Sequence, residues 1–129
     1  MYLKTIMLID DDLDDRGLFC HTVSEISPEI ECLQFSKYKH ALEYLRTVPK
    51  YPDIVFVGIS PHLYDSSDFI LEIKNDVRTN HIPIYIYSTQ FLFEHLEDEV
   101  KAEVEGHVFK STDCKEMRYN ISNILKNDK

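Results

Sequence analysis

Short apolar runs alternate along the chain with longer segments whose apolar residues recur three or four positions apart. The most apolar run lies within 51–60, where Ile54, Val55, Phe56 and Val57 follow one another without a polar residue. A run of this kind is typical of a strand that is covered on both faces, as in a parallel sheet flanked by helices. The stretch therefore predicts a fully buried central strand.

The remaining pattern predicts a regular alternation of strands and helices. Further short apolar runs predict strands over 4–9, 30–35, 84–88 and 106–109. Helical spacing of apolar residues predicts helices over 14–24, 39–47, 67–77, 94–105 and 114–126. Strands and helices that alternate through short loops predict a single α/β domain over 1–129, with a doubly wound, five-stranded parallel sheet in a three-layer sandwich.

Composition and charge exclude several classes of function. A chain of 129 residues with 43% hydrophobic residues is long enough to bury one core. The net charge of -9 disfavours contact with nucleic-acid phosphates, because such binding depends on Lys and Arg. No apolar run approaches the ~18 residues of a membrane span, and the N-terminus does not resemble a signal peptide. We therefore expect a cytoplasmic protein that binds neither nucleic acid nor membranes.

The cysteines give no sign of a disulfide or metal framework. Cys20, Cys32 and Cys114 are odd in number and widely spaced, and no histidine lies at metal-binding spacing from another histidine or a cysteine. We interpret all three cysteines as reduced thiols, as expected in the cytoplasm.

An acidic loop at 10–15 follows the first predicted strand. Taken alone it indicates a solvated loop before a helix, whose positive N-terminal end favours Asp14 and Asp15. Parallel sheets, however, place their chemistry just beyond the carboxyl ends of their strands. The central strand ends there on Gly58, which has no side chain.

Several fragments, in their order and spacing, resemble a response-regulator receiver domain of bacterial two-component signalling, which has the flavodoxin-like architecture. They span essentially the whole chain and read Leu-Ile-Asp-Asp-Asp, Pro-Asp-Ile-Val-Phe-Val, Phe-Ile-Leu-Glu-Ile-Lys, His-Ile-Pro-Ile-Tyr-Ile-Tyr-Ser-Thr and Val-Phe-Lys. Receivers accept a phosphoryl group from a histidine kinase on an aspartate at the end of the third strand. The resemblance implies the same architecture for this chain.

The resemblance also implies roles for individual residues. Asp10 and Asp11 take the positions of the acidic pair that holds Mg²⁺ in receivers. Ser88 and Lys110 occupy the positions that bind the phosphoryl oxygens. His107 stands at the position of the aromatic switch residue.

Gly58 stands where receivers carry the phosphorylatable aspartate, so the nucleophile is missing. Ser66 replaces the usual loop glycine, Ser111 the usual proline and His107 the usual aromatic residue. We therefore predict a pseudo-receiver without enzymatic activity, which signals by contact with a histidine kinase, a downstream effector or a second copy of itself. Its only cofactor would be Mg²⁺, and we expect weak or no binding because the third carboxylate is lost.

Different arrangements of the pocket remain open. Asp10 and Asp11 can stay clustered for a metal, or the ammonium of Lys110 can reach across the space left by Gly58 and neutralise both. Ser88 and Lys110 can equally serve structure alone. If the pocket is intact, Gly58→Asp is expected to restore part of the metal binding and phosphorylation.

Two other functions compete with the pseudo-receiver. A phosphoacceptor receiver would use an unconventional residue such as Ser60, which lacks an evident general base, or Asp65, which lies seven residues beyond the vacant position. A flavin-binding protein of the same architecture is a weaker alternative, because an acidic loop repels phosphate.

Three consecutive bulky apolar residues follow the fourth strand, where receivers generally carry polar ones. They are Phe91, Leu92 and Phe93. A short connection can hardly bury all three, so they predict an exposed patch for a protein partner or a homodimer. The resemblance places this patch on the usual output face, made by the fourth helix, fifth strand and fifth helix. The alternative is a local hydrophobic staple onto the following helix.

Overall fold

A parallel sheet with strand order β2-β1-β3-β4-β5 forms the centre of the computed structural model, which describes residues 3–60, 66–110 and 113–126. The strands are β1 (Thr5–Ile9), β2 (Glu31–Phe35), β3 (Ile54–Gly58), β4 (Ile84–Ser88) and β5 (Gly106–Phe109). The helices are α1 (Leu13–Ile26), α2 (Tyr38–Thr47), α3 (Ser66–Asn75), α4 (Gln90–Glu94), α5 (Asp98–Lys101) and α6 (Cys114–Leu125). The predicted doubly wound α/β fold is confirmed.

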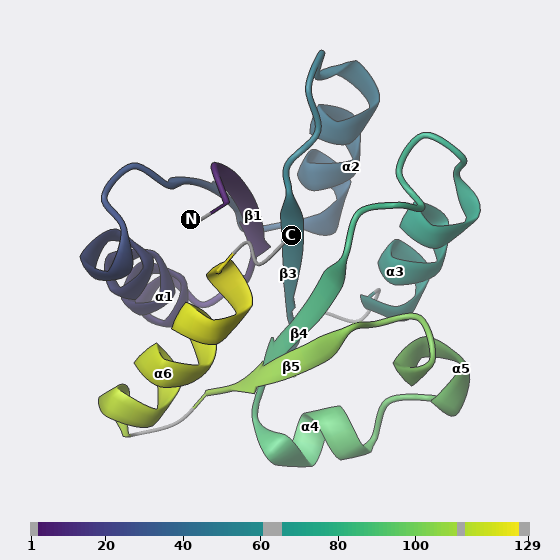
Figure 1. Ribbon diagram of the computed structural model, residues 1–129. Coiled ribbons are helices and arrows are strands. Elements are labelled where there is room, and N and C mark those ends of the chain that lie inside the picture. Colours follow the sequence, from purple (N-terminus) through teal and green to yellow (C-terminus); the bar gives the residue numbers. More distant parts are fainter. Residues whose placement is uncertain (1–2, 61–65, 111–112, 127–129) are drawn as a thin grey trace.

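Helices cover both faces of the sheet (Figure 1). α1 and α6 pack on one face, and α2, α3 and α5 pack on the other. Successive strand residues point to opposite faces, so each strand supplies both layers of the core. In β3 every residue is buried, with Ile54 and Phe56 facing α1 and α6, and Val55 and Val57 facing the opposite layer. The uninterrupted apolar run follows from this double coverage.

The strand order creates a switch point between β1 and β3. These neighbours pair in parallel with Ile9 opposite Val57, and the chain leaves β1 toward one edge and β3 toward the other. Ligand crevices of open α/β sheets form at such a point, beyond the carboxyl ends of the strands. The register places Asp10 and Gly58, one residue further along each strand, beside each other at this edge.

The predicted helix over 94–105 is wrong. The structure instead has two short helices, α4 and α5, separated by a turn around Leu96. The side chain of Thr89 caps α4 by accepting a hydrogen bond from the N–H of Leu92, so a helix begins before the predicted one. Because the helix is interrupted between α4 and α5, Leu92 and Val100 can both pack against the same core cluster. This packing outweighs the four-residue spacing of apolar residues that predicted one continuous helix.

The third helix also ends earlier than predicted. α3 stops at Asn75, and Val77, the last residue of the predicted helix, is 84% exposed beyond it. The chain turns here because Asp76 pairs with Arg78 and its carbonyl accepts the N–H groups of Thr79 and Asn80.

The expectation of three reduced cysteines is wrong for two of them. Cys20 of α1 and Cys32 of β2 form a disulfide, whereas Cys114 is free and exposed. The sequence separation of 12 residues hides their proximity, which arises because α1 returns the chain to the edge strand. Within the described part of the chain, none of the helices has the length and apolar character needed to span a bilayer.

Candidate functional site

Asp10 lies at the centre of the carboxyl edge and is completely buried. Its backbone N–H donates to the carbonyl of Phe35, and its own carbonyl accepts a 2.7 Å hydrogen bond from Nη1 of Arg16. The carboxylate Oδ1 accepts from the N–H of Asp12 at 2.9 Å. The side chain is therefore oriented by β2, by the loop after β1 and by α1.

Lys110 is the cation that faces Asp10. Its N–H donates to the carbonyl of Ser88 at 2.8 Å, which continues the β4–β5 ladder past the end of the strand. The side chain is 12% exposed, and Nζ lies 2.8 Å from Oδ2 of Asp10 and 3.0 Å from Oδ2 of Asp15. Nζ also lies 5.0 Å from the ring centroid of Tyr87. One ammonium thus joins the loops after β1 and β5 and the first turn of α1.

Asp15 is positioned by the start of α1. The carboxylate of Asp12 caps the helix by accepting the N–H groups of Asp14 and Asp15. The hydroxyl of Tyr87 donates to the carbonyl of Asp15 at 3.1 Å. Sequence analysis missed Asp15 as a partner of Lys110. The N-cap at Asp12 was the signal, since it places Asp15 in the first helical turn beside the loop.

Burial and pairing shift the ionisation of this cluster in opposite senses. Burial raises the pKa of the Asp10 carboxyl above its ordinary value, and the contact with Lys110 offsets this only in part. Burial lowers the pKa of Lys110, but its contacts with and attraction to Asp10 and Asp15 together outweigh burial, so that the pKa of Lys110 is raised. Among the described residues, Oδ2 of Asp10 accepts no hydrogen bond with favourable angles. The Lys110 ammonium, 2.8 Å away, nevertheless neutralises the charge of this carboxylate.

Asp11 does not join Asp10 in this cluster. Its Oδ1 accepts a 2.6 Å hydrogen bond from the hydroxyl of Ser60, which follows β3. The sequence left open whether Asp10 and Asp11 cluster for a metal or are both neutralised by Lys110. In the structure Lys110 neutralises Asp10, but its second partner is Asp15 and not Asp11. The structure also supplies Ser60 with a carboxylate that can accept its proton, which sequence analysis did not identify.

Ser88 is completely buried, and its hydroxyl donates to the carbonyl of Thr89 at 2.9 Å. This hydroxyl is thus occupied by a local bond. Beside the cluster lies a cleft of about 360 Å³, whose polar lining consists of Asp11, Asp12, Asp15, Ser60, Thr89 and Lys110. Ser66 is buried at the start of α3, whereas Asp65 and Ser111 lie outside the described residues.

Gly58 is packed too closely against β1 to carry a side chain. A Cβ atom there would lie 2.8 Å from Cβ and Cγ of Asp10 and closer still to the carbonyl oxygen of Ile9. The Ile9 oxygen belongs to the backbone, so β1 itself would have to move. This packing argues against the partial restoration expected of Gly58→Asp, because the neighbouring strand fills the space that an aspartate side chain would need.

The donor set does not fit a magnesium ion. Mg²⁺ requires several oxygen ligands in near-octahedral geometry. Asp10 faces an ammonium and Asp11 a hydroxyl, and β3 contributes no carboxylate. Across 3–60, 66–110 and 113–126, no three His, Cys, Asp or Glu side chains are grouped so that they could hold a metal.

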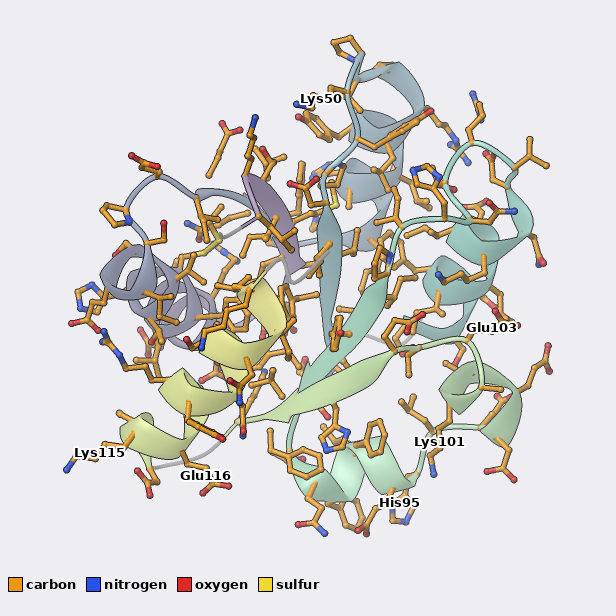
Figure 2. All side chains as sticks on the ribbon, in the orientation of Figure 1. Lys50, His95, Lys101, Glu103, Lys115 and Glu116 are labelled. Carbon is orange, nitrogen blue, oxygen red and sulfur yellow. A yellow bond between two sulfur atoms is a disulfide. The ribbon has the colours of Figure 1, made fainter. Side chains whose placement is uncertain are left out.

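Aromatic side chains gather on α4 and β5 at the edge of the sheet. We call Phe91, Phe93, His95, His107 and Phe109 the aromatic surface. His107 is exposed and stacks on Phe109 with ring centroids 4.1 Å apart, and Phe93 lies 4.6 Å from His107. Phe91 is 65% exposed and lies 4.2 Å from the ring of His95, which Figure 2 shows on the outer side of α4.

Residues 91–93 were expected in the connection before a helix, but they lie within the helix α4. Leu92 and Phe93 are half-buried against the core, as the staple alternative required. Phe91 alone of the three is exposed.

These features define the fold class of the domain. An acidic loop after β1 and a lysine after β5 meet at the switch point of a sheet with order β2-β1-β3-β4-β5, as in receiver domains. The chain has the receiver fold.

Solved structures show the same likeness. The phosphorylated cyanobacterial phytochrome response regulator RcpA matches with a TM-score of 0.75 and 20% identity over 95% of this chain and 91% of that one. The Mn²⁺-bound response regulator Rcp1 matches with a TM-score of 0.76 and 20% identity over 98% and 97% of the two chains. The bacteriophytochrome response regulator AtBRR matches with a TM-score of 0.77 and 18% identity over 100% and 98%. No protein-family model and no curated protein matches the sequence.

Substitution of Gly58 is expected to destabilise the domain. Gly58→Ala should lower the free energy of unfolding by about 1–3 kcal/mol, because its Cβ collides with the backbone of β1. Urea denaturation measures this loss. Gly17→Ala is the matched control, since nothing lies within 4 Å of a Cβ in that helical position, and it should stabilise by about 0.5–1 kcal/mol. Gly58→Asp should be destabilised as well and gain no Mg²⁺ affinity in calorimetry; a stable, metal-binding Gly58→Asp variant would contradict the packing argument.

Removal of the Lys110 ammonium is expected to destabilise the domain in a pH-dependent way. Lys110→Met leaves the Asp10 carboxylate buried without a cation, which should cost about 3–5 kcal/mol at neutral pH. Without the ammonium the folded-state pKa of Asp10 rises further above its unfolded value, so protonation favours the folded state. The deficit relative to wild type should therefore shrink as pH falls from about 7 to 4. Lys115→Met, at an exposed position of α6, should change little, and a deficit independent of pH would count against the buried ion pair.

Proposed function

We propose that the chain is a pseudo-receiver, a cytoplasmic signalling domain that acts through protein contacts without aspartyl phosphorylation and without enzymatic activity. The receiver fold supports a place in two-component signalling. The close approach of Ile9 and Asp10 to Gly58 carries the rest of the proposal. A receiver needs a carboxylate at this position as the nucleophile, and here neither the residue nor the space for it is present.

The state of Lys110 supports the same proposal. In a phosphorylated receiver the lysine must contact an incoming phosphoryl oxygen. Here its ammonium already has two carboxylate partners, Asp10 at 2.8 Å and Asp15 at 3.0 Å. An anionic donor would have to compete with both while approaching an acidic loop, which is electrostatically unfavourable. The domain is thus held in one arrangement by its own charges.

Magnesium binding is proposed to be weak or absent. RcpA is phosphorylated and Rcp1 binds Mn²⁺ on the same fold, so the fold itself does not exclude either chemistry. What differs here is the donor set, in which Asp10 is paired with a cation and Asp11 with Ser60.

The proposed partner surface is the aromatic surface on α4 and β5. Aromatic side chains are enriched at protein interfaces relative to the rest of the protein surface. The ring of Phe91 lies 4.2 Å from that of His95. Lys101, at the end of α5 (Figure 2), lies 5.7 Å from the ring of Phe93 and borders the aromatic surface on that side. A histidine kinase or downstream effector fits this surface, and so does a second copy of the chain as a homodimer that also involves α6.

An unconventional phosphoacceptor remains the second candidate because of one contact. The hydroxyl of Ser60 donates to Asp11 at the cleft, so a base is in place beside a possible nucleophile.

Incubation with acetyl phosphate and Mg²⁺ tests the proposal directly. The intact mass of the wild-type protein should stay unchanged, because no acceptor carboxylate is present at the edge of β3, and calorimetric titration should show no tight Mg²⁺ binding. A mass gain of one phosphoryl group would overturn the pseudo-receiver. If the gain is lost in Ser60→Ala, the second candidate takes its place.

Loss of the exposed aromatic ring of α4 is expected to weaken association. Phe91→Ser should reduce self-association in sedimentation, or capture of a cognate histidine kinase, by about 10-fold or more if Phe91 anchors the interface. Val77→Ser is the matched control, since Val77 is equally apolar and 84% exposed but lies beyond α3. Equal association of the two variants would exclude the aromatic surface as the interface.

A further inference from the structure

The Cys20–Cys32 disulfide has no part in the functions described above. It joins α1 to β2, the edge strand of the sheet, with a Cα–Cα distance of 6.2 Å. Both cysteines are half-buried and pack at the margin of the core layer under α1 and α6. We propose that this pair is a reversible redox site, which a dithiol reductant opens and a small-molecule disulfide such as glutathione disulfide closes.

The position of the pair makes it accessible to such reagents. Exchange requires a thiolate to reach one sulfur atom, so a fully buried disulfide is inert while the protein is folded. Here neither cysteine is fully buried, and β2 pairs with β1 on one side only. The neighbouring strand residues Glu31 and Gln34 are exposed, which leaves the outer side of this edge open to solvent.

Thiol–disulfide exchange at this pair needs no group from the carboxyl edge of the sheet. One thiolate of the reductant attacks a sulfur of the pair and forms a mixed disulfide, releasing the other cysteine as a thiolate that takes up a proton. The second reductant thiolate displaces the first cysteine and closes a cyclic disulfide. Two electrons pass to the protein, which ends with two thiols; glutathione disulfide reverses this and leaves as two glutathione molecules.

Opening the pair is expected to act on the Lys110 cluster through α1. Arg16 lies one helical turn before Cys20, and its guanidinium donates both to Gln34 of β2 and to the carbonyl of Asp10. The disulfide and Arg16 therefore fasten the same helix to the same strand. Asp15, next in sequence to Arg16, contacts Lys110. Reduction frees α1 at one of these two points and weakens the hold on Asp15.

The test uses the full chain with Cys114→Ser, because the exposed Cys114 thiol would otherwise form bonds between molecules. The folded protein is treated with dithiothreitol or glutathione disulfide and then with iodoacetamide without denaturant. Intact mass should show two alkylated thiols after reduction and none after oxidation. The Tm of the reduced form should be roughly 10 °C lower, the effect expected for opening a loop of this length.

Two further variants separate a redox site from a purely structural clamp. The double variant Cys20→Ser, Cys32→Ser, in the same background, should have the Tm of the reduced form, and dithiothreitol should not change that Tm. If it does not fold, the reduced parent carries the comparison. Lys110→Met should lower Tm less in the reduced form than in the oxidised form, because the Asp15 contact is already weakened. Alkylation only above the Tm, or equal Lys110→Met shifts in both forms, would overturn the proposal.

Discussion

The ion cluster around Lys110 is the interaction on which the carboxyl edge of this domain depends. A carboxylate as buried as Asp10 is costly unless a cation neutralises it, and Lys110 is the cation that contacts it. Lys110 follows β5, Asp10 follows β1, and the second partner Asp15 lies in the first turn of α1. Neutralising one buried charge therefore also connects these three segments. The cation that stabilises this edge, Lys110, stands at the position where a receiver would use it to bind phosphate.

Gly58 belongs to the same arrangement. Without a side chain on β3, the end of β1 approaches closely, so that the Ile9 carbonyl and the Asp10 side chain fill the position of an acceptor. The absence of a side chain at Gly58 and the contact of Lys110 with Asp10 are therefore features of the same close packing between β1 and β3. Reversing only one of them would leave the other in conflict with it, so we do not expect a single substitution to recreate a phosphorylation site.

Functions that do not need this edge remain available elsewhere on the molecule. The core layers on both faces of the sheet are buried and apolar, so they support the fold and offer no chemistry. Exposed features lie at the two ends of the strand order: the aromatic surface beside β5, and the disulfide at β2. We propose the first for contact with a protein and the second for exchange with thiols, and α1 connects the disulfide to the Lys110 cluster.

Sequence patterns predicted the architecture because they report local environments. An apolar run such as 54–57 indicates burial on both faces, and the alternation of strands with amphipathic helices then predicts a parallel sheet with helices on both sides. The resemblance to receiver domains, together with the rule that parallel strands carry function at their carboxyl ends, pointed to Asp10, Ser88 and Lys110 as residues of one edge. Contacts between side chains were not predictable in the same way. The partners of Lys110 and Asp11, the disulfide and the filled space at Gly58 depend on distances between segments far apart in the chain. Strand twist, loop path and helix packing set those distances, and no local pattern records them.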